Sequence, residues 1–170
     1  QAAEKVLEEK QAEGVSVLLM NPQNGEIYAM VNVPEFNLNE PYRLNDKTED
    51  QMTDEERQNR LNQMWRNPCL NDTYEPGSTF KMVSSTAGLA EGVIDTSSKI
   101  NCTGIFTEIS NQPKCWIYPG AHGMDNVSEA LRDSCNVFFY TTGFRLASKD
   151  TGSYDDENGM KYIQKYASIY

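Results

Sequence analysis

The stretch YEPGSTFK, residues 74–81, decides how the rest of the chain is interpreted. A Pro-Gly turn brings Ser78 to the start of a predicted helix, and Lys81 follows three residues later. Residues at i and i+3 share one helix face, so these two side chains can meet. Unpaired backbone N–H groups and the helix dipole favour negative charge in a first turn. Partial burial would lower the pKa of Lys81 and let it act as a base. The pattern therefore predicts a nucleophile with its own activator.

A second motif, SCN at residues 134–136, follows at a predicted joint between two helices. Each motif has a purely structural explanation when taken alone. Roughly one Ser-x-x-Lys is expected by chance in a chain of this length, and Ser and Asn often cap helices. The two motifs together favour a catalytic role, and the predicted catalytic residues are Ser78, Lys81, Ser134 and Asn136.

The composition of the chain limits the other possibilities. Its 170 residues suffice for one domain, and 38% hydrophobic with 24% charged residues is ordinary for a globular protein. The net charge of −10, without a basic cluster, argues against nucleic acid as a partner and is typical of a soluble protein. The sequence contains no run of eighteen apolar residues, so it predicts no membrane span. Because the chain begins at Gln1 rather than Met, we expect it to be part of a longer protein.

The order of predicted elements indicates an α+β fold. Residues 1–13 are predicted as a helix closed by Gly14, and residues 15–33 as a β-hairpin around an Asn-Gly turn. The polar excursion at 34–71 is too long for a plain connection, so a partly helical segment or a mobile loop is expected. Helices dominate after Ser78 without βαβ alternation. Two strands are too few for a stable sheet, which favours a partial domain or strands supplied from elsewhere.

Three segments together resemble the transpeptidase domain of a class B penicillin-binding protein: YEPGSTFK, SCN and MNPQNGEIYAMVNVPEFN. The resemblance runs from about Val15 to the C-terminus, and its motifs appear in the family's order. GAHG followed by VSEALRDSCN is closer to the elongation-type relatives, which are similar to penicillin-binding protein 2. The resemblance implies a partial penicillin-binding/β-lactamase-like serine transpeptidase fold. Residues 1–170 would be its N-terminal part, a hairpin plus a helical subdomain, with the excursion at 34–71.

One departure from the family pattern is the missing third motif. No Lys-Thr-Gly or Lys-Ser-Gly occurs in the 170 residues. In the family this motif supplies a second oxyanion N–H and the contacts that hold the substrate carboxylate. The resemblance therefore implies that the chain stops before the motif and carries half of an active site.

The resemblance implies a peptidoglycan D,D-transpeptidase that needs no cofactor for catalysis. Ser78 would attack the carbonyl of a D-alanyl-D-alanine stem peptide, Lys81 would accept its proton, and an amine from a second stem peptide would resolve the acyl-enzyme. Ser134 would relay a proton to the leaving group, and Asn136 would hold the donor amide. β-Lactams would acylate Ser78.

The resemblance also implies a place in the cell and leaves alternatives open. The protein would act on the extracytoplasmic side of the cell membrane, through an anchor upstream of Gln1, with a glycan polymerase as partner. A D,D-carboxypeptidase or serine β-lactamase, in which water resolves the ester, remains an alternative. So do a β-lactam-sensing domain without turnover and a structural domain with chance motifs.

The cysteines and the single histidine suggest a metal site. Cys102, Cys115, His122 and Cys135 offer three soft ligands and one nitrogen, which suit tetrahedral zinc. Some elongation-type relatives are similar in having a metal site of Asp, His and Cys ligands. His122 and Cys135 look like matches, while Cys102 and Cys115 would stand where those relatives use carboxylates. A Cys102–Cys115 disulfide, or no link at all, remains open. Cys69 would lie outside the site.

Overall fold

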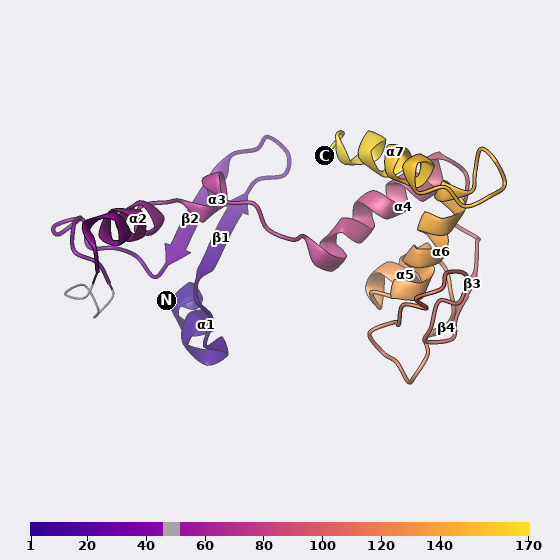
Figure 1. Ribbon diagram of the computed structural model, residues 1–170, viewed down its shortest axis with the longest axis horizontal. Helices are drawn as coiled ribbons and strands as arrows, with labels where there is room; N and C mark the ends of the chain where they lie inside the picture. Colours follow the sequence, from indigo (N-terminus) through magenta and orange to yellow (C-terminus); the bar gives the residue numbers. More distant parts are fainter. Residues whose placement is uncertain (46–51) are drawn as a thin grey trace. The chain divides into compact units, whose positions relative to one another are not determined.

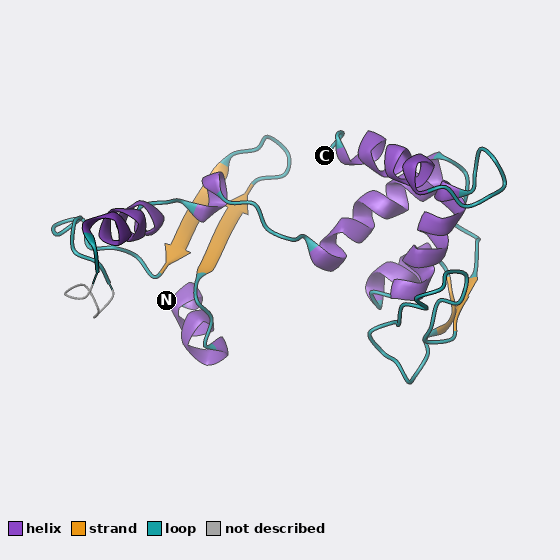
Figure 2. Ribbon diagram, in the orientation of Figure 1, coloured by secondary structure: helices purple, strands orange, loops and turns teal. Residues whose placement is uncertain are grey.

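The computed structural model describes residues 1–45 and 52–170, and the chain divides into two compact units, residues 1–75 and 76–170 (Figure 1). The first unit combines a β-hairpin with three helices, and the second is mainly helical with one short pair of strands (Figure 2). This mixture of helix and strand confirms the predicted α+β class.

The first unit contains the predicted hairpin. Strands β1 (Val15–Met20) and β2 (Ile27–Val33) pair antiparallel, with Val15 opposite Val33. The turn between them closes through Gly25, whose φ of 77° is the positive value that an Asn-Gly turn provides. The apolar side chains of β1 remain exposed, by 41–56% from Val17 to Met20. The hairpin therefore forms no core of its own, as expected for two strands alone.

The helices of the first unit correct the predicted end of the first helix and confirm that the excursion at 34–71 is partly helical. Helix α1 (Ala2–Lys10) ends because Gln11 adopts a left-handed conformation with φ 50°, so the predicted stop at Gly14 was wrong. The excursion contains α2 (Asp54–Met64) and α3 (Pro68–Asn71), and is therefore partly helical. Residues 46–51, in the polar run at its centre, lie outside the described residues.

The second unit is a group of packed helices. Their bounds are 3-10 turn η2 Gly77–Phe80, α4 Lys81–Ala90, α5 Val127–Arg132, α6 Asn136–Ala147 and α7 Asp156–Ala167. Helices α4, α6 and α7 pack against one another (Figure 1). The predicted capping box is present at the start of α5, between Asn126 and Glu129. None of the helices described here is long and apolar enough to cross a bilayer.

The helices α4 and α6 approach closely because α4 carries a glycine at the contact. A Cβ on Gly88 would lie 2.6 Å from Cγ2 of Thr142, which is fully buried on α6. A side chain at position 88 would therefore force the helices apart. These two helices begin at Lys81 and Asn136, so their close packing brings two predicted catalytic residues together.

The segment predicted as irregular, residues 96–124, contains a short pair of strands. Strand β3 (Ile100–Cys102) pairs antiparallel with β4 (Gly123–Asp125), and Cys102 lies opposite Gly123. A three-residue strand is too short for an alternating pattern to reveal it. This pairing brings Cys102 next to His122, although the two residues are 20 positions apart in the sequence.

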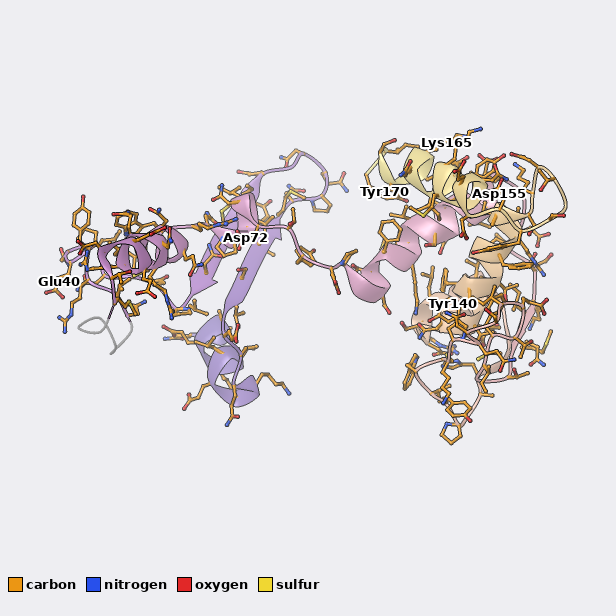
Figure 3. The ribbon with its side chains drawn as sticks, viewed as in Figure 1. Glu40, Asp72, Tyr140, Asp155, Lys165 and Tyr170 are labelled. Atoms are coloured by element: carbon orange, nitrogen blue, oxygen red, sulfur yellow. The ribbon has the colours of Figure 1, made fainter. Side chains whose placement is uncertain are left out.

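Helix α7 and the residues after it are tied to α4 by polar contacts. Glu91 accepts hydrogen bonds from Lys149, from Lys165 at 2.6 Å and from the Tyr166 hydroxyl at 2.7 Å. These bonds, that from Lys149 first, lower the pKa of Glu91 to about 2. Figure 3 shows Lys165 on α7 and Tyr170 at the chain end, where the Tyr170 hydroxyl lies 2.7 Å from Oγ1 of Thr86.

Candidate active site

Ser78 lies in a 3-10 turn directly before α4, rather than inside the helix as predicted. Gly77 precedes it with φ 55°, a left-handed conformation that glycine adopts readily and other residues do not. Thr79 donates its backbone N–H to the carbonyl of Pro76 at 3.3 Å and its hydroxyl to the same oxygen at 2.6 Å. The Pro-Gly turn is thus closed on itself and presents Ser78 with its side chain exposed.

Ser134 is held in an unusual conformation at the joint between α5 and α6. Its backbone N–H bonds to the carbonyl of Leu131 at 3.3 Å, and that of Cys135 bonds to the carbonyl of Ala130 at 2.9 Å. This pair of bonds is a Schellman motif, in which the residue after the helix cap is left-handed and usually glycine. Ser134 takes that position with φ 52°. A left-handed residue other than glycine costs about 1–2 kcal/mol, so the conformation is retained despite its cost.

The predicted catalytic residues are joined in one hydrogen-bond chain. Lys81 Nζ donates to the carbonyl oxygen of Ser134 at 2.7 Å, to its Oγ at 2.9 Å, and to Oδ1 of Asn136 at 2.6 Å. The Ser134 hydroxyl lies 2.9 Å from Oγ of Ser78. In the described part of the chain these hydrogen bonds connect Ser78 to Lys81 through Ser134. The structure thus brings all four residues together.

The environment of Lys81 makes its amine easier to deprotonate than an exposed lysine. Burial lowers the pKa of its amine, and the negative charge available on the thiols of Cys115 and Cys135 opposes that shift. The ring of Phe139 lies on one side of the amine, with 5.6 Å between Nζ and the ring centre. Phe139 was not singled out from the sequence, since an apolar residue of a buried helix carries no catalytic signal. A lysine with a lowered pKa is suited to accept a proton from a serine.

The predicted metal ligands also meet, beside this chain of hydrogen bonds. The ligand atoms of Cys102, Cys115, His122 and Cys135 lie within 4.8 Å of one another, and the three cysteines are buried. His122 Nδ1 is 3.6 Å from the sulfur of Cys102 and 3.6 Å from that of Cys115. All four cysteines are free thiols, so the structure does not contain the alternative Cys102–Cys115 disulfide. Cys69 belongs to the first unit, where its sulfur lies 3.4 Å from Oδ1 of Asn32.

The thiol cluster is connected to the catalytic residues through the backbone. Asn136 donates its backbone N–H to the sulfur of Cys115 at 3.3 Å. Although burial opposes ionisation of Cys115, backbone hydrogen bonds led by that of Val137 lower the pKa of its thiol overall. Burial raises the pKa of Cys135, which lies between Ser134 and Asn136. The cluster and the SCN motif therefore form one connected site.

Trp116 is a site neighbour that sequence reasoning missed. Its Nε1–H donates to the backbone carbonyl of Asp133 at 3.0 Å, directly before Ser134. Its ring meets that of His122 edge-on, with 5.6 Å between centres, yet the residue is 63% exposed. The only signal in the sequence was its position next to Cys115, a candidate ligand.

Comparisons with known sequences agree with the motifs. The protein-family model described as the penicillin binding protein transpeptidase domain matches residues 15–167. Stage V sporulation protein D of Bacillus subtilis is 30% identical over 149 residues, 87% of this chain and 21% of that protein. Peptidoglycan D,D-transpeptidase MrdA of Acinetobacter baumannii is 30% identical over 128 residues, 74% of this chain and 18% of that protein. The chain thus spans about a fifth of the length of these relatives.

Solved structures show the same fold. PBP2 of Helicobacter pylori, in a complex with MreC, matches 96% of this chain and 28% of its own, with a TM-score of 0.68 and 24% identity. PBP2 of Pseudomonas aeruginosa, in complex with WCK 5153, matches 98% of this chain and 34% of its own, with a TM-score of 0.69 and 21% identity. The fold implied by the motifs is therefore confirmed.

Proposed function

This chain belongs to the penicillin-binding protein transpeptidase family, and we propose that it supplies the nucleophile and the proton-transfer residues of a peptidoglycan D,D-transpeptidase. The observation that carries the proposal is the chain of hydrogen bonds from Lys81 through Ser134 to Ser78. It joins a nucleophile to a base whose pKa is lowered by burial. If this joint had no catalytic function, glycine would suit its left-handed position better than Ser134 does.

The first half of the reaction forms an ester on Ser78. Its oxygen attacks the carbonyl between the two D-alanines of a stem peptide, and its proton passes through the Ser134 hydroxyl to neutral Lys81. Lys81, now an ammonium, returns this proton through the Ser134 hydroxyl to the nitrogen of the departing D-alanine. Asn136 hydrogen bonds Lys81 through Oδ1, which leaves its side-chain NH₂ to hold the carbonyl of the donor peptide. Division of acyl transfer into two steps is the usual role of such a serine.

The second half releases the product and restores the enzyme. An amine of a neighbouring stem peptide attacks the ester, Lys81 takes a proton from that amine, and Ser78 regains one as the crosslink forms. No cofactor enters either step. In a D,D-carboxypeptidase or a serine β-lactamase, water would take the place of the amine. Rapid hydrolysis of a chromogenic β-lactam by the full-length protein would favour those alternatives, and stable acylation without crosslinking would favour a sensing domain.

The whole protein is proposed to act in wall elongation and cell shape, as the resemblance of GAHG and VSEALRDSCN to elongation-type relatives suggests. Residues 1–170 are proposed as the N-terminal part of its transpeptidase domain. The expected partners are stem peptides, β-lactams and a glycan polymerase. The expected location is the extracytoplasmic side of the cell membrane, through an anchor in another part of the protein.

Covalent labelling of the full-length protein by a fluorescent penicillin tests the assignment. Ser78→Ala is expected to abolish labelling and Lys81→Ala nearly to do so, without additive losses, because the residues act as a unit. Ser84→Ala is the matched control, since Ser84 lies on α4 and its hydroxyl donates to the helix carbonyl of Phe80 at 3.4 Å. Labelling of the Ser78 variant at another serine would show that the nucleophile has been misassigned.

We also propose that Cys102, Cys115, His122 and Cys135 hold a structural zinc ion. Tetrahedral zinc has Zn–S distances of about 2.3 Å and Zn–N distances of about 2.0–2.1 Å, so sulfur and nitrogen ligands lie roughly 3.6 Å apart. Both measured Sγ–Nδ1 distances are 3.6 Å. The N–H of Asn136 directed at the sulfur of Cys115 supports a thiolate there. The donor set therefore fits zinc, which would compensate the charge of the clustered thiolates.

Metal content separates this proposal from unconnected thiols. The full-length protein is expected to contain about one zinc per chain, with an anomalous signal at the zinc edge and sulfur atoms about 2.3 Å away. Cys115→Ser should lower the zinc content, while Cys69→Ser should leave it unchanged because Cys69 is not one of the four clustered ligands. Equal zinc content in both variants, or a Cys102–Cys115 bond of about 2.05 Å, would contradict the proposal.

A further inference from the structure

Phe139 places an aromatic ring against the amine of Lys81. Its ring centre is 5.6 Å from Nζ, which is within the range of a cation–π contact. The side chain is 8% exposed, and its ring meets that of Phe138 edge-on, with 5.4 Å between centres. The ring is therefore enclosed by the core and held in one orientation toward the amine.

The start of α6 explains why the ring reaches this amine. Asn136 and Phe139 are three positions apart in the first turn of the helix, so their side chains share one face. Oδ1 of Asn136 accepts a hydrogen bond from Nζ at 2.6 Å, and the ring lies over the same nitrogen. One helix face thus presents both a hydrogen-bond acceptor and a π face to Lys81.

The oxygen atoms bonded to Nζ suit a protonated amine although none of them is charged. They are the carbonyl and hydroxyl oxygens of Ser134 and the amide oxygen of Asn136. An ammonium has three N–H donors, so three acceptors match it in number. These neutral groups position the ammonium without holding the proton on it permanently, as a carboxylate would.

The other influences on the charge of Lys81 come from burial and from two thiols. Burial lowers the pKa of the amine, and negative charge on Cys115 and Cys135 acts in the opposite direction. A zinc ion held by the thiols would neutralise much of that charge. The π face of Phe139 is a source of stabilisation for the ammonium that does not depend on the thiols.

We propose that Phe139 is a positioning residue for proton transfer, whose ring stabilises the ammonium that forms on Lys81 while Ser78 is acylated. This inference rests on the proposed function, in which Lys81 receives the proton of Ser78. The attraction between a cation and a π face acts only while the amine carries the proton. An interaction that is stronger in the transition state than in the ground state accelerates the chemical step.

The pH dependence of acylation by benzylpenicillin tests this role in the full-length protein. Phe139→Leu keeps an apolar side chain and removes the π face. The second-order rate constant on the alkaline plateau should fall about threefold to tenfold, the range expected for one cation–π contact at a partly buried site. The midpoint of the profile, which reports the free enzyme, should move to lower pH because the resting ammonium is destabilised as well. The two profiles should therefore converge toward acidic pH.

Two further variants separate the ring from the packing of the core. Phe138→Leu is the matched control, because it makes the same change in a fully buried neighbour and leaves the ring of Phe139 over Lys81. It should lower Tm without moving the midpoint. Phe139→Tyr keeps the ring and should retain both the plateau and the midpoint. Phe139 lines a cavity of about 270 Å³, which offers space for the added hydroxyl.

Several outcomes would overturn the inference. A midpoint that moves to higher pH in Phe139→Leu would mean that the ring acts by excluding water from the amine. Equal losses at every pH would make Phe139 a support for the backbone of α6. An unchanged profile, or a Phe139→Tyr profile that matches that of Phe139→Leu, would also contradict the role of the ring. If benzylpenicillin does not acylate the unaltered protein, the proposed function itself fails, whereas each of the other outcomes concerns Phe139 alone.

Discussion

Replacing Gly88 by alanine tests whether α4 and α6 are as close as the structure shows. The added Cβ would lie 2.6 Å from Cγ2 of Thr142 and 3.0 Å from Cδ1 and Cγ1 of Ile94. Thr142 is fully buried and Ile94 is 3% exposed, so neither side chain has free space. Thr142 also donates its hydroxyl to the carbonyl of Phe138 at 2.9 Å, a bond that is lost if the side chain rotates away.

The expected magnitude follows from three opposing contributions. Overpacking a core costs about 1–3 kcal/mol, and loss of the Thr142 hydrogen bond adds about 1 kcal/mol. Alanine is favoured over glycine inside a helix by about 1 kcal/mol. Gly88→Ala should therefore lower the free energy of unfolding by roughly 1–3 kcal/mol. In a domain of 150–250 residues each kcal/mol corresponds to about 2–4 °C in Tm.

Gly143→Ala in the full-length protein is the matched control. Gly143 lies in α6, and no atom of the described residues, apart from its own helix backbone and chain neighbours, is within 4 Å of its Cβ position. This variant should gain the helix preference and raise Tm by about 2–4 °C. Differential scanning calorimetry of both variants gives the comparison. A Gly88→Ala protein as stable as the unaltered protein would refute the close approach, and equal destabilisation by both would refute the reasoning from the clash.

Three further predictions concern the reaction and one helix end. The neutral fraction of Lys81 rises with pH, and β-lactam acylation should rise with it. Because burial lowers the pKa of Lys81, the rate should level off before about pH 10.4, the ordinary lysine value. Stopped-flow rates that still climb at that pH would contradict this. Residues 1–170 alone should be labelled about a hundred- to a thousand-fold more slowly than the full-length protein, because an oxyanion donor is missing; equal rates would show that the absent motif matters less. Asn126→Ala removes the cap of α5 and should lower stability by about 1 kcal/mol in urea unfolding, whereas no change would show that the cap contributes little.

The meeting of the four candidate catalytic residues was predictable because short motifs identify them. Ser78 and Lys81 are three positions apart at the start of a helix, so local geometry alone brings them near each other. Ser134 and Asn136 come from a distant part of the chain. Their place in the site was therefore predicted from the SCN motif and not from residue spacing. The hairpin and the capping box at Asn126 were predictable for the same reason, since each depends on a few neighbouring residues.

Features that depend on tertiary contacts were not predictable. The β3–β4 pair consists of three-residue strands held by pairing between distant segments, and no periodicity announces it. The end of α1 at Gln11 requires a left-handed residue that is not glycine, so the pattern pointed to Gly14 instead. The exposed face of Trp116 depends on a bond to Asp133, seventeen positions away in the sequence. The strand pair and the tryptophan contact are supplied by the packed structure, whereas the end of α1 is closed by local bonds from residues 11 and 12.

The conformation of Ser134 explains why this joint departs from local rules. A Schellman motif prefers glycine at the left-handed position, and glycine there would avoid a cost of about 1–2 kcal/mol. Glycine would also remove the hydroxyl that links Lys81 to Ser78. The sharp turn at this residue lets its carbonyl and its hydroxyl both reach the same amine. The Schellman motif accounts for the left-handed conformation, whereas the choice of serine over glycine at this position is the kind of local cost found at functional sites. The joint therefore accepts a local cost while it holds one hydroxyl between the amine of Lys81 and the hydroxyl of Ser78.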